Sequence, residues 1–188
     1  MKENMKKSLV SIFIITIMVS SVIGFIFSRS SGESETFEYK GISFQRDEFK
    51  WGTEIEDKRY EFDYLPQQVE HINISKGLDL DAFQVDMTSE EDSLFPEEIA
   101  YSEYTLASSL KKRSDTYTRI GFTANNTYGL PVIDCTSATE NVPVIYFKDA
   151  NNTKISIEKN CIIAVSEDSE GFIKIKDRLL YEILDIMN

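Results

Sequence analysis

The sequence is poor in the residues that most enzyme chemistry uses. It has one histidine, His71, and two cysteines in 188 residues. The motifs G-x-x-x-x-G-K-[ST], G-x-G-x-x-G, G-x-S-x-G, H-E-x-x-H and C-x-x-C are all missing. A metal hydrolase or a serine–histidine triad would depend on His71 alone, and a lone histidine is more often structural or solvated than a metal ligand. Catalysis by carboxylates alone stays open, because two acids can meet from distant positions of the chain.

Basic residues are also few. The chain has 20 Lys and Arg against 32 Asp and Glu, a formal charge of -12. Nucleic acids and anionic lipid head groups need a basic surface, so neither is expected as a partner. The acids between Asp79 and Asp92 do not form an EF-hand pattern, because Phe83 and Val85 stand where oxygen ligands are needed. We predict no cofactor and no metal site.

One long apolar run is present, at Leu9–Phe27. It follows Lys2, Lys6 and Lys7 and contains no charged residue. A helix of about 20 apolar residues spans the roughly 30 Å hydrocarbon core of a bilayer, and basic residues flank the cytoplasmic end. We therefore predict a cytoplasmic tip and transmembrane anchor at 1–28, a flexible tether at 29–35, and an extracytoplasmic domain at 36–188. The alternative is a cleaved signal peptide, although the run is long for one and lacks an A-x-A-like site.

The two cysteines, Cys135 and Cys161, agree with an extracytoplasmic location. In an oxidising compartment an isolated pair usually forms a disulfide. The alternatives are two buried free thiols, or a catalytic thiol that would lack a nearby histidine. Three N-glycosylation sequons begin at Asn73, Asn125 and Asn151 and are candidate glycan sites.

The first third of the predicted domain has the pattern of a β-meander. Aromatic and aliphatic residues alternate with polar ones from Thr36 to Tyr64, which is typical of half-buried strands. We expect three or four antiparallel strands, with turns at Lys40-Gly41, Arg46-Asp47 and Glu56-Lys58. The aromatic rows are predicted to form the inner face of the sheet rather than a binding surface.

Two main helices are predicted. One runs from Pro96 to Lys112, with proline and acids in its first turn and basic residues at its end. Glu103 lies near its apolar stripe, and we interpret it as a flanking residue rather than a buried functional carboxylate. The other begins after Asp168 or Ser169 and continues through Met187. A short helix is expected at 66–72.

The remaining strands are predicted at 80–87, 116–123, 144–147, 154–158 and 161–165. The run Val144-Ile145-Tyr146-Phe147 is apolar throughout and indicates a strand buried on both faces. We expect Asp149–Asn152 to form a hairpin turn, so that the last three strands make one antiparallel unit. The fold class is then α+β: an N-terminal transmembrane helix, followed by a domain of antiparallel strands, meander plus C-terminal three-strand unit, packed with two main helices.

The C-terminal half resembles a group of uncharacterised archaeal membrane-anchored proteins. The resemblance lies in Cys135, in residues 142–147, in Asn160-Cys161-Ile162-Ile163 and in residues 177–184. It implies an extracytoplasmic α+β domain and lends no activity and no site residues.

The function expected from these features is binding rather than catalysis. We predict a single-pass membrane protein whose extracytoplasmic domain is a non-enzymatic binding or envelope-assembly module, with a protein partner at the cell surface. The alternative is a membrane-tethered hydrolase that uses paired carboxylates. A deep pocket with two neighbouring carboxyl groups would favour the hydrolase.

Overall fold

The chain forms two compact units, Met1–Glu35 and Thr36–Asn188. The computed structural model describes residues 12–23, 35–74, 80 and 82–187. Residues 12–23 are helical with exposed side chains. Among the described residues, no helix is both long enough and apolar enough to cross a bilayer. Both ends of the apolar run Leu9–Phe27 lie outside the described residues.

The second unit begins with the predicted meander. Its four strands pair in sequence order with antiparallel neighbours. They are β1 (Thr36–Tyr39), β2 (Ile42–Asp47), β3 (Lys50–Ile55) and β4 (Lys58–Phe62). The second turn was predicted wrongly: it lies at Glu48-Phe49, because Asp47 still pairs with Lys50 in the ladder and Glu48 takes the positive φ of 53° that the turn needs.

Most aromatic residues of the meander form its inner face, as predicted, whereas Phe49 lies in a turn and is exposed. Phe44, Trp51, Tyr60 and Phe62 are buried. Phe62 stacks on Tyr181 of the last helix with ring centroids 4.3 Å apart, and Phe44 meets the same ring edge-on. The meander therefore shares its core with the C-terminal helix.

A second sheet follows, with the strand order β6-β5-β7-β9-β8. Its strands are β5 (Gln84–Ser89), β6 (Tyr117–Phe122), β7 (Val144–Asp149), β8 (Lys154–Glu158) and β9 (Cys161–Ser166). The first four in this order are mutually parallel, and only β8 is antiparallel to its neighbour. Strand β7 lies in the middle and is mostly buried, as its apolar run predicts.

The prediction of purely antiparallel strands is wrong for this sheet, which is mixed. Residues 149–152 do not close a hairpin, because β7 pairs with β9 and not with β8. The hairpin lies one connection later, at Lys159-Asn160, where Lys159 has a φ of 57°. The strand predicted at 80–87 runs instead from Gln84 to Ser89.

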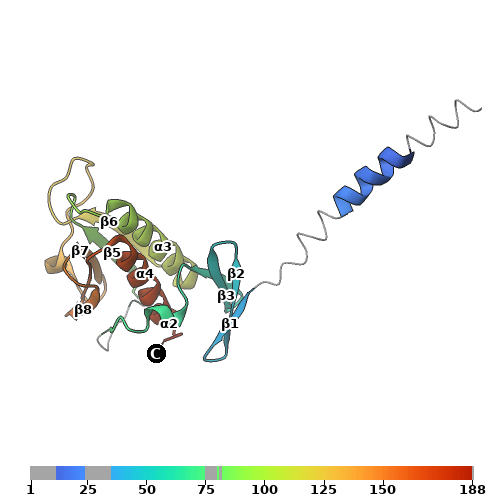
Figure 1. Ribbon diagram of the computed structural model, residues 1–188. Helices are drawn as coiled ribbons and strands as arrows, with labels where there is room; N and C mark the ends of the chain where they lie inside the picture. The colour runs from blue at the N-terminus through green and yellow to red at the C-terminus, as the bar shows by residue number, and fades with distance from the viewer. Residues whose placement is uncertain (1–11, 24–34, 75–79, 81, 188) are drawn as a thin grey trace, which may run out of the picture. The chain divides into compact units, whose positions relative to one another are not determined.

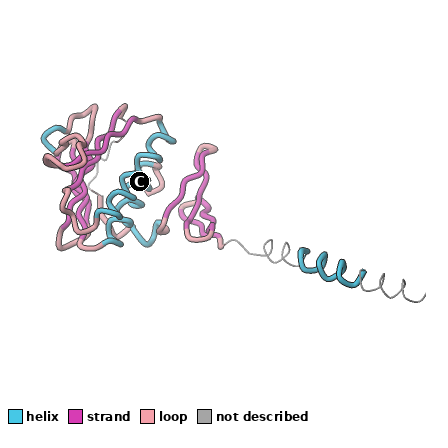
Figure 2. Tube along the Cα trace, turned by 90° about the horizontal axis from the view of Figure 1, so that it is seen from above, coloured by secondary structure: helices cyan, strands magenta, loops and turns pink. Residues whose placement is uncertain are grey.

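Helices α3 (Pro96–Ser114) and α4 (Ser169–Ile183) lie between the two sheets (Figures 1 and 2). They pack on each other, with α3 also against β4 and β6 and α4 against β9. Asp168 caps α4 by accepting a hydrogen bond of 2.6 Å from the Gly171 N–H. The short helix α2 (Pro66–Val69) ends earlier than predicted and packs on α4.

The face of the mixed sheet that points away from α3 and α4 is covered by the segment that carries the disulfide. Cys135, in the 3-10 turn η1 (Cys135–Ser137), is bonded to Cys161 at the start of β9, with Cα atoms 5.3 Å apart. The predicted disulfide is thus confirmed. Ile133, Val144 and Cys161 form a small separate core beneath it.

Candidate functional site

A cavity of about 260 Å³ opens at one end of the mixed sheet. It lies between the last residues of β5 and β6, the first two turns of α3, and a loop that follows β6. Its lining consists of Ser89, Glu90, Glu91, Ser93, Pro96, Ile99, Ala100, Glu103, Ile120, Gly121, Phe122, Tyr128 and Leu130. Most of this wall is apolar, and the charged groups in it are glutamates.

The position of the cavity follows from the strand directions. Strands β5 and β6 are parallel, so their carboxyl ends meet at the same edge of the sheet. The strand order also reverses at β5, because β6 pairs on one side of it and β7, the next strand, on the other. Open α/β sheets commonly bind ligands outside the carboxyl ends of strands near such a reversal.

Glu103 is the unusual residue of this cavity. It follows Ile99 by four residues and precedes Leu106 by three, so it lies on the buried stripe of α3. Its residue exposure is 4%. Its atom Oε1 is enclosed and has no hydrogen-bond partner. The interpretation of Glu103 as a flanking residue is therefore wrong, since the stripe carries it inward with Ile99 and Leu106.

Burial controls the charge of Glu103. Loss of hydration raises the pKa of its carboxyl to about 8, and no charged side chain contributes to that shift. The group is therefore mostly protonated at neutral pH. A protonated carboxyl can both donate and accept a hydrogen bond, and a nearby cation would favour its ionised form.

The other two glutamates of the cavity are already engaged. Glu90 Oε1 accepts a hydrogen bond of 2.6 Å from the Tyr146 hydroxyl and lies 3.5 Å from Lys148 Nζ. Glu91 Oε1 accepts bonds of 2.9 and 2.6 Å from Thr127 N–H and Oγ1, which lower the pKa of that carboxyl. Glu103 is the one glutamate of the three whose carboxyl is left for a ligand.

An aromatic pair stands at the rim. Phe122 and Tyr128 stack with centroids 5.8 Å apart, and Tyr128 is 72% exposed. The loop that follows β6, residues 123–131, is called the rim loop. Asn126 fixes its conformation, because the Asn126 side chain accepts a hydrogen bond from Leu130 N–H at 3.0 Å and donates one to Leu130 C=O at 2.9 Å. The loop then runs so close to β6 that a Cβ at Gly121 would lie 2.3 Å from the Pro131 oxygen.

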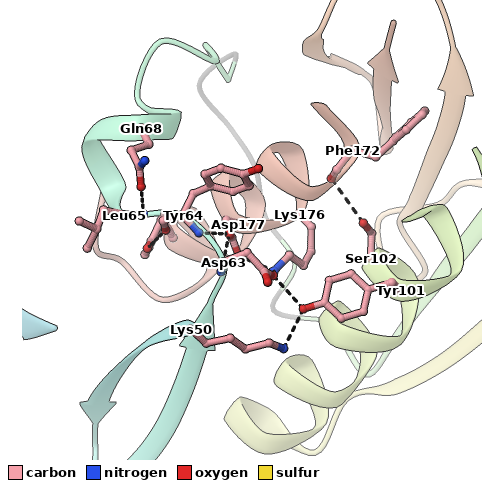
Figure 3. Close-up of polar contacts among 11 residues, drawn as sticks. Lys50, Asp63, Tyr64, Leu65, Gln68, Tyr101, Ser102, Phe172, Lys176 and Asp177 are labelled. Atoms are coloured by element: carbon pink, nitrogen blue, oxygen red, sulfur yellow. Dashed lines mark hydrogen bonds and ion pairs between the residues drawn. The ribbon is translucent and has the colours of Figure 1, made fainter. Parts of the chain in front are cut away.

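A second group of charged residues joins the meander to the helices. Lys176 Nζ lies 2.5 Å from Asp63 Oδ2 and 2.6 Å from Asp177 Oδ1, and the Lys176 and Asp177 side chains have no exposed surface. Tyr101 donates to Asp63 and accepts from Lys50, each at 2.8 Å (Figure 3). Burial opposes the charge on Lys176, but the two carboxylates outweigh it and raise the pKa of the ammonium.

This charged group has its partners within the chain. Asp177 Oδ2 accepts the backbone N–H groups of Asp63 and Tyr64 at 2.9 and 2.8 Å. Asp177 Oδ1 accepts no hydrogen bond of good geometry, yet it lies against the Lys176 ammonium. Because its charges are paired with one another and with backbone N–H groups, we interpret this cluster as a structural clamp, a contact that holds the meander against α4.

A larger hollow, of about 530 Å³, lies on the meander beside Gly41 to Gln45 and Gly52 to Ile55. Its one cation, Arg59, is half exposed and paired with Asp47 at 3.3 Å. Among the residues that line it there is no enclosed polar side-chain atom lacking a partner. It therefore offers less chemistry than the cavity at Glu103.

The remaining sequence candidates do not line the cavity, although Asn125 belongs to the rim loop. Asn73, Asn125 and Asn151 are exposed, as glycan acceptors must be. His71 is exposed as well. Within the part of the chain that is described, no three His, Cys, Asp or Glu side chains are grouped to hold a metal ion.

Comparison of this chain with protein-family models, with curated proteins and with solved structures finds no match. The resemblance to archaeal membrane-anchored proteins stays a prediction. Function is therefore inferred from the cavity and its residues.

Proposed function

We propose that this chain is a membrane-tethered binding module whose extracytoplasmic domain takes a small organic molecule into the cavity at Glu103. The proposal rests on the Glu103 side chain, which lines the cavity and whose carboxyl has an enclosed oxygen, Oε1, with no hydrogen-bond partner. A buried polar group left unpaired costs roughly 1–3 kcal/mol. A ligand that donates a hydrogen bond to this carboxyl recovers part of that free energy.

The volume of the cavity limits the size of the ligand. Cavities for drug-sized molecules measure roughly 300–1,000 Å³, and this one measures about 260 Å³. The ligand is accordingly small. Ile99, Ile120 and Phe122 offer it an apolar wall, and Glu103 offers a polar contact that orients it.

Binding is favoured over the alternative of a hydrolase with paired carboxylates. Such an enzyme needs one acid and one base or nucleophile, both free to act on the bond that breaks. Glu90 and Glu91 are held by Tyr146, Lys148 and Thr127. That leaves Glu103 as a lone carboxyl in this cavity.

The membrane tether and the extracytoplasmic location are parts of the same proposal. The uncharged run Leu9–Phe27 and the lysines before it support them. So does the Cys135–Cys161 bond, because disulfides persist in oxidising compartments.

The test is a titration of the full-length protein, labelled at isoleucine methyl groups, with a mixed set of small cations, anions and neutral molecules. Ile99 and Ile120 line the cavity, whereas Ile42 and Ile55 line the hollow on the meander. We expect ligands that shift the first pair of NMR signals and leave the second unchanged. Ala100→Trp, which adds an indole at the exposed side of the cavity, should abolish the shifts. If no compound moves Ile99 or Ile120, the proposal is wrong.

A further inference from the structure

The charge of the cavity selects among ligand classes. Its lining contains three glutamates and no lysine, arginine or histidine. A carboxylate or phosphate ligand would meet the negative charge of Glu90 and Glu91, and the cation beside Glu90, Lys148, is already paired with it. Anions are thus disfavoured as ligands, which leaves cations and neutral molecules as the two candidate classes.

We propose that the ligand is a small organic ammonium ion, whose nitrogen pairs with the Glu103 carboxylate while its apolar part lies against Ile99, Ile120 and Phe122. The inference rests on the proposed binding function and specifies its ligand class. Two features support it: the enclosed oxygen that lacks a donor, and the aromatic rim. An ammonium has three donors and no acceptor, so it can pair with the Glu103 carboxylate without placing a second acceptor beside it.

The aromatic pair at the mouth adds to the selection. The faces of aromatic rings attract cations, with a free energy of about 0.5–1 kcal/mol at exposed sites. Tyr128 and Phe122 are stacked where a ligand enters. A cation therefore meets a favourable surface before it reaches the carboxylate.

Binding of an ammonium ion changes the protonation of the site. The free carboxyl of Glu103 holds a proton at neutral pH because burial raises its pKa to about 8. An ammonium beside it stabilises the carboxylate, so the proton leaves Glu103 for the solvent as the ligand enters. Affinity should then rise between about pH 6 and pH 8, and fall near pH 10 where the amine loses its own charge.

The other ionisable groups that line the cavity do not replace Glu103 in this linkage. Glu90 is held by the Tyr146 hydroxyl and the Lys148 ammonium, and the bonds from Thr127 lower the pKa of Glu91. Tyr128 lies at the exposed rim. From α4, which packs on α3, no charged side chain contributes to the pKa shift of Glu103. The proton released should therefore come from Glu103.

The experiment is isothermal titration of the full-length protein with three probes of similar shape: 2-phenylethylammonium, 2-phenylethanol and phenylacetate. We expect the ammonium ion to bind at least about tenfold tighter than the alcohol, as is usual for a hydrogen bond to a charged group. Phenylacetate should bind weakest. Repeating the titration at pH 7 in buffers of different ionisation enthalpy should show release of close to one proton with the ammonium probe.

Two variants separate the role of Glu103 from that of the helix. Glu103→Gln keeps the shape of the side chain and should remove both the preference for the ammonium ion and the proton release. Glu97→Gln lies in the exposed first turn of α3 and should change neither.

The outcomes distinguish this inference from the function on which it rests. If the alcohol or the acid binds at Glu103 as tightly as the ammonium ion, or if no proton is released, the ligand class is wrong and the binding function stands. If none of the three probes binds and no small molecule shifts Ile99 or Ile120, both proposals are wrong.

Discussion

Lys176 Nζ lies 2.5 Å from Asp63 Oδ2, an ion pair that joins the last helix to the end of the meander. The ammonium is fully buried, and Asp177 Oδ1 lies 2.6 Å from it. A buried charge is stable only with well-placed partners, and here Asp63 comes from the end of the meander whereas Asp177 is the neighbour of Lys176 on α4. This contact ties the end of the meander to α4.

Replacement of Lys176 by methionine should destabilise the protein strongly. The change leaves Asp177 buried without its cation, and breaking a buried pair from one side costs about 3–5 kcal/mol. Urea unfolding measures the loss. Lys174→Met is the matched control, because its pair with Glu170 is partly exposed and should contribute less than about 1 kcal/mol. If the two variants lose similar free energies of unfolding, Lys176 does not have the structural role proposed for it.

Glu103 should make stability depend on pH. Its pKa is raised from 4.5 to about 8 in the folded protein, so the fold binds a proton that the unfolded chain has released. Its contribution is fully favourable below about pH 4.5 and is lost as the pH rises through 8, a total on the order of 3–5 kcal/mol.

The variant Glu103→Gln cannot ionise, which gives a direct comparison. It should match the wild-type protein in urea unfolding at pH 4 and exceed it in stability at pH 9. Glu97→Gln should follow the wild-type curve at both values. If the wild-type protein is as stable as Glu103→Gln at pH 9, Glu103 is not the buried, unpaired carboxyl described above.

The order of the mixed sheet could not be predicted from the sequence. Val144 to Phe147 indicate a buried central strand, but apolar runs do not reveal whether neighbouring strands are parallel. Polar residues 149–152 have the composition of a hairpin turn, yet they lead to the outer strand β8. Pairing of β7 with β9 depends on contacts between distant parts of the chain, which local patterns do not encode.

By contrast, local signals predicted α3 and the meander well. Pro96 and the acids beside it start the helix where expected, and the basic residues 111–113 stand at its end. The alternation of aromatic and polar residues predicted the four strands because one face of the meander is buried, with Phe44 and Phe62 against Tyr181. The same helical spacing that places Ile99 inward also places Glu103 inward, so the signal for the cavity was present in the sequence. The sequence does not reveal, however, that the Glu103 carboxyl has an oxygen without a hydrogen-bond partner.

The disulfide should contribute substantially to stability. Cys135 and Cys161 are 26 residues apart, and a loop of this size restricts the unfolded chain by roughly 3.5 kcal/mol in the entropy model. The double variant Cys135→Ser, Cys161→Ser should lose about that amount in urea unfolding. The control is the wild-type protein treated with a reducing agent, which should match the variant. An unchanged unfolding midpoint in both samples would contradict the prediction.

Gly121→Ala should deform the cavity, whereas Gly52→Ala should be tolerated. A Cβ at Gly121 would lie 2.3 Å from the Pro131 oxygen, a backbone atom that accepts the Phe122 N–H at 3.0 Å. A Cβ at Gly52 would meet only the guanidinium of Arg59, at 2.7 Å, and that half-exposed side chain can move.

Because the rim loop must shift to make room, we expect Gly121→Ala to lose about 1–3 kcal/mol of stability. It should also weaken ligand binding, since Phe122, Tyr128 and Leu130 all line the cavity. Hydrogen exchange at the Phe122 and Ile133 amides, which bond across this contact, should become faster in Gly121→Ala and stay unchanged in Gly52→Ala. Equal protection of these amides in the two variants would show that the close approach of the loop to β6 does not hold the wall of the cavity in place.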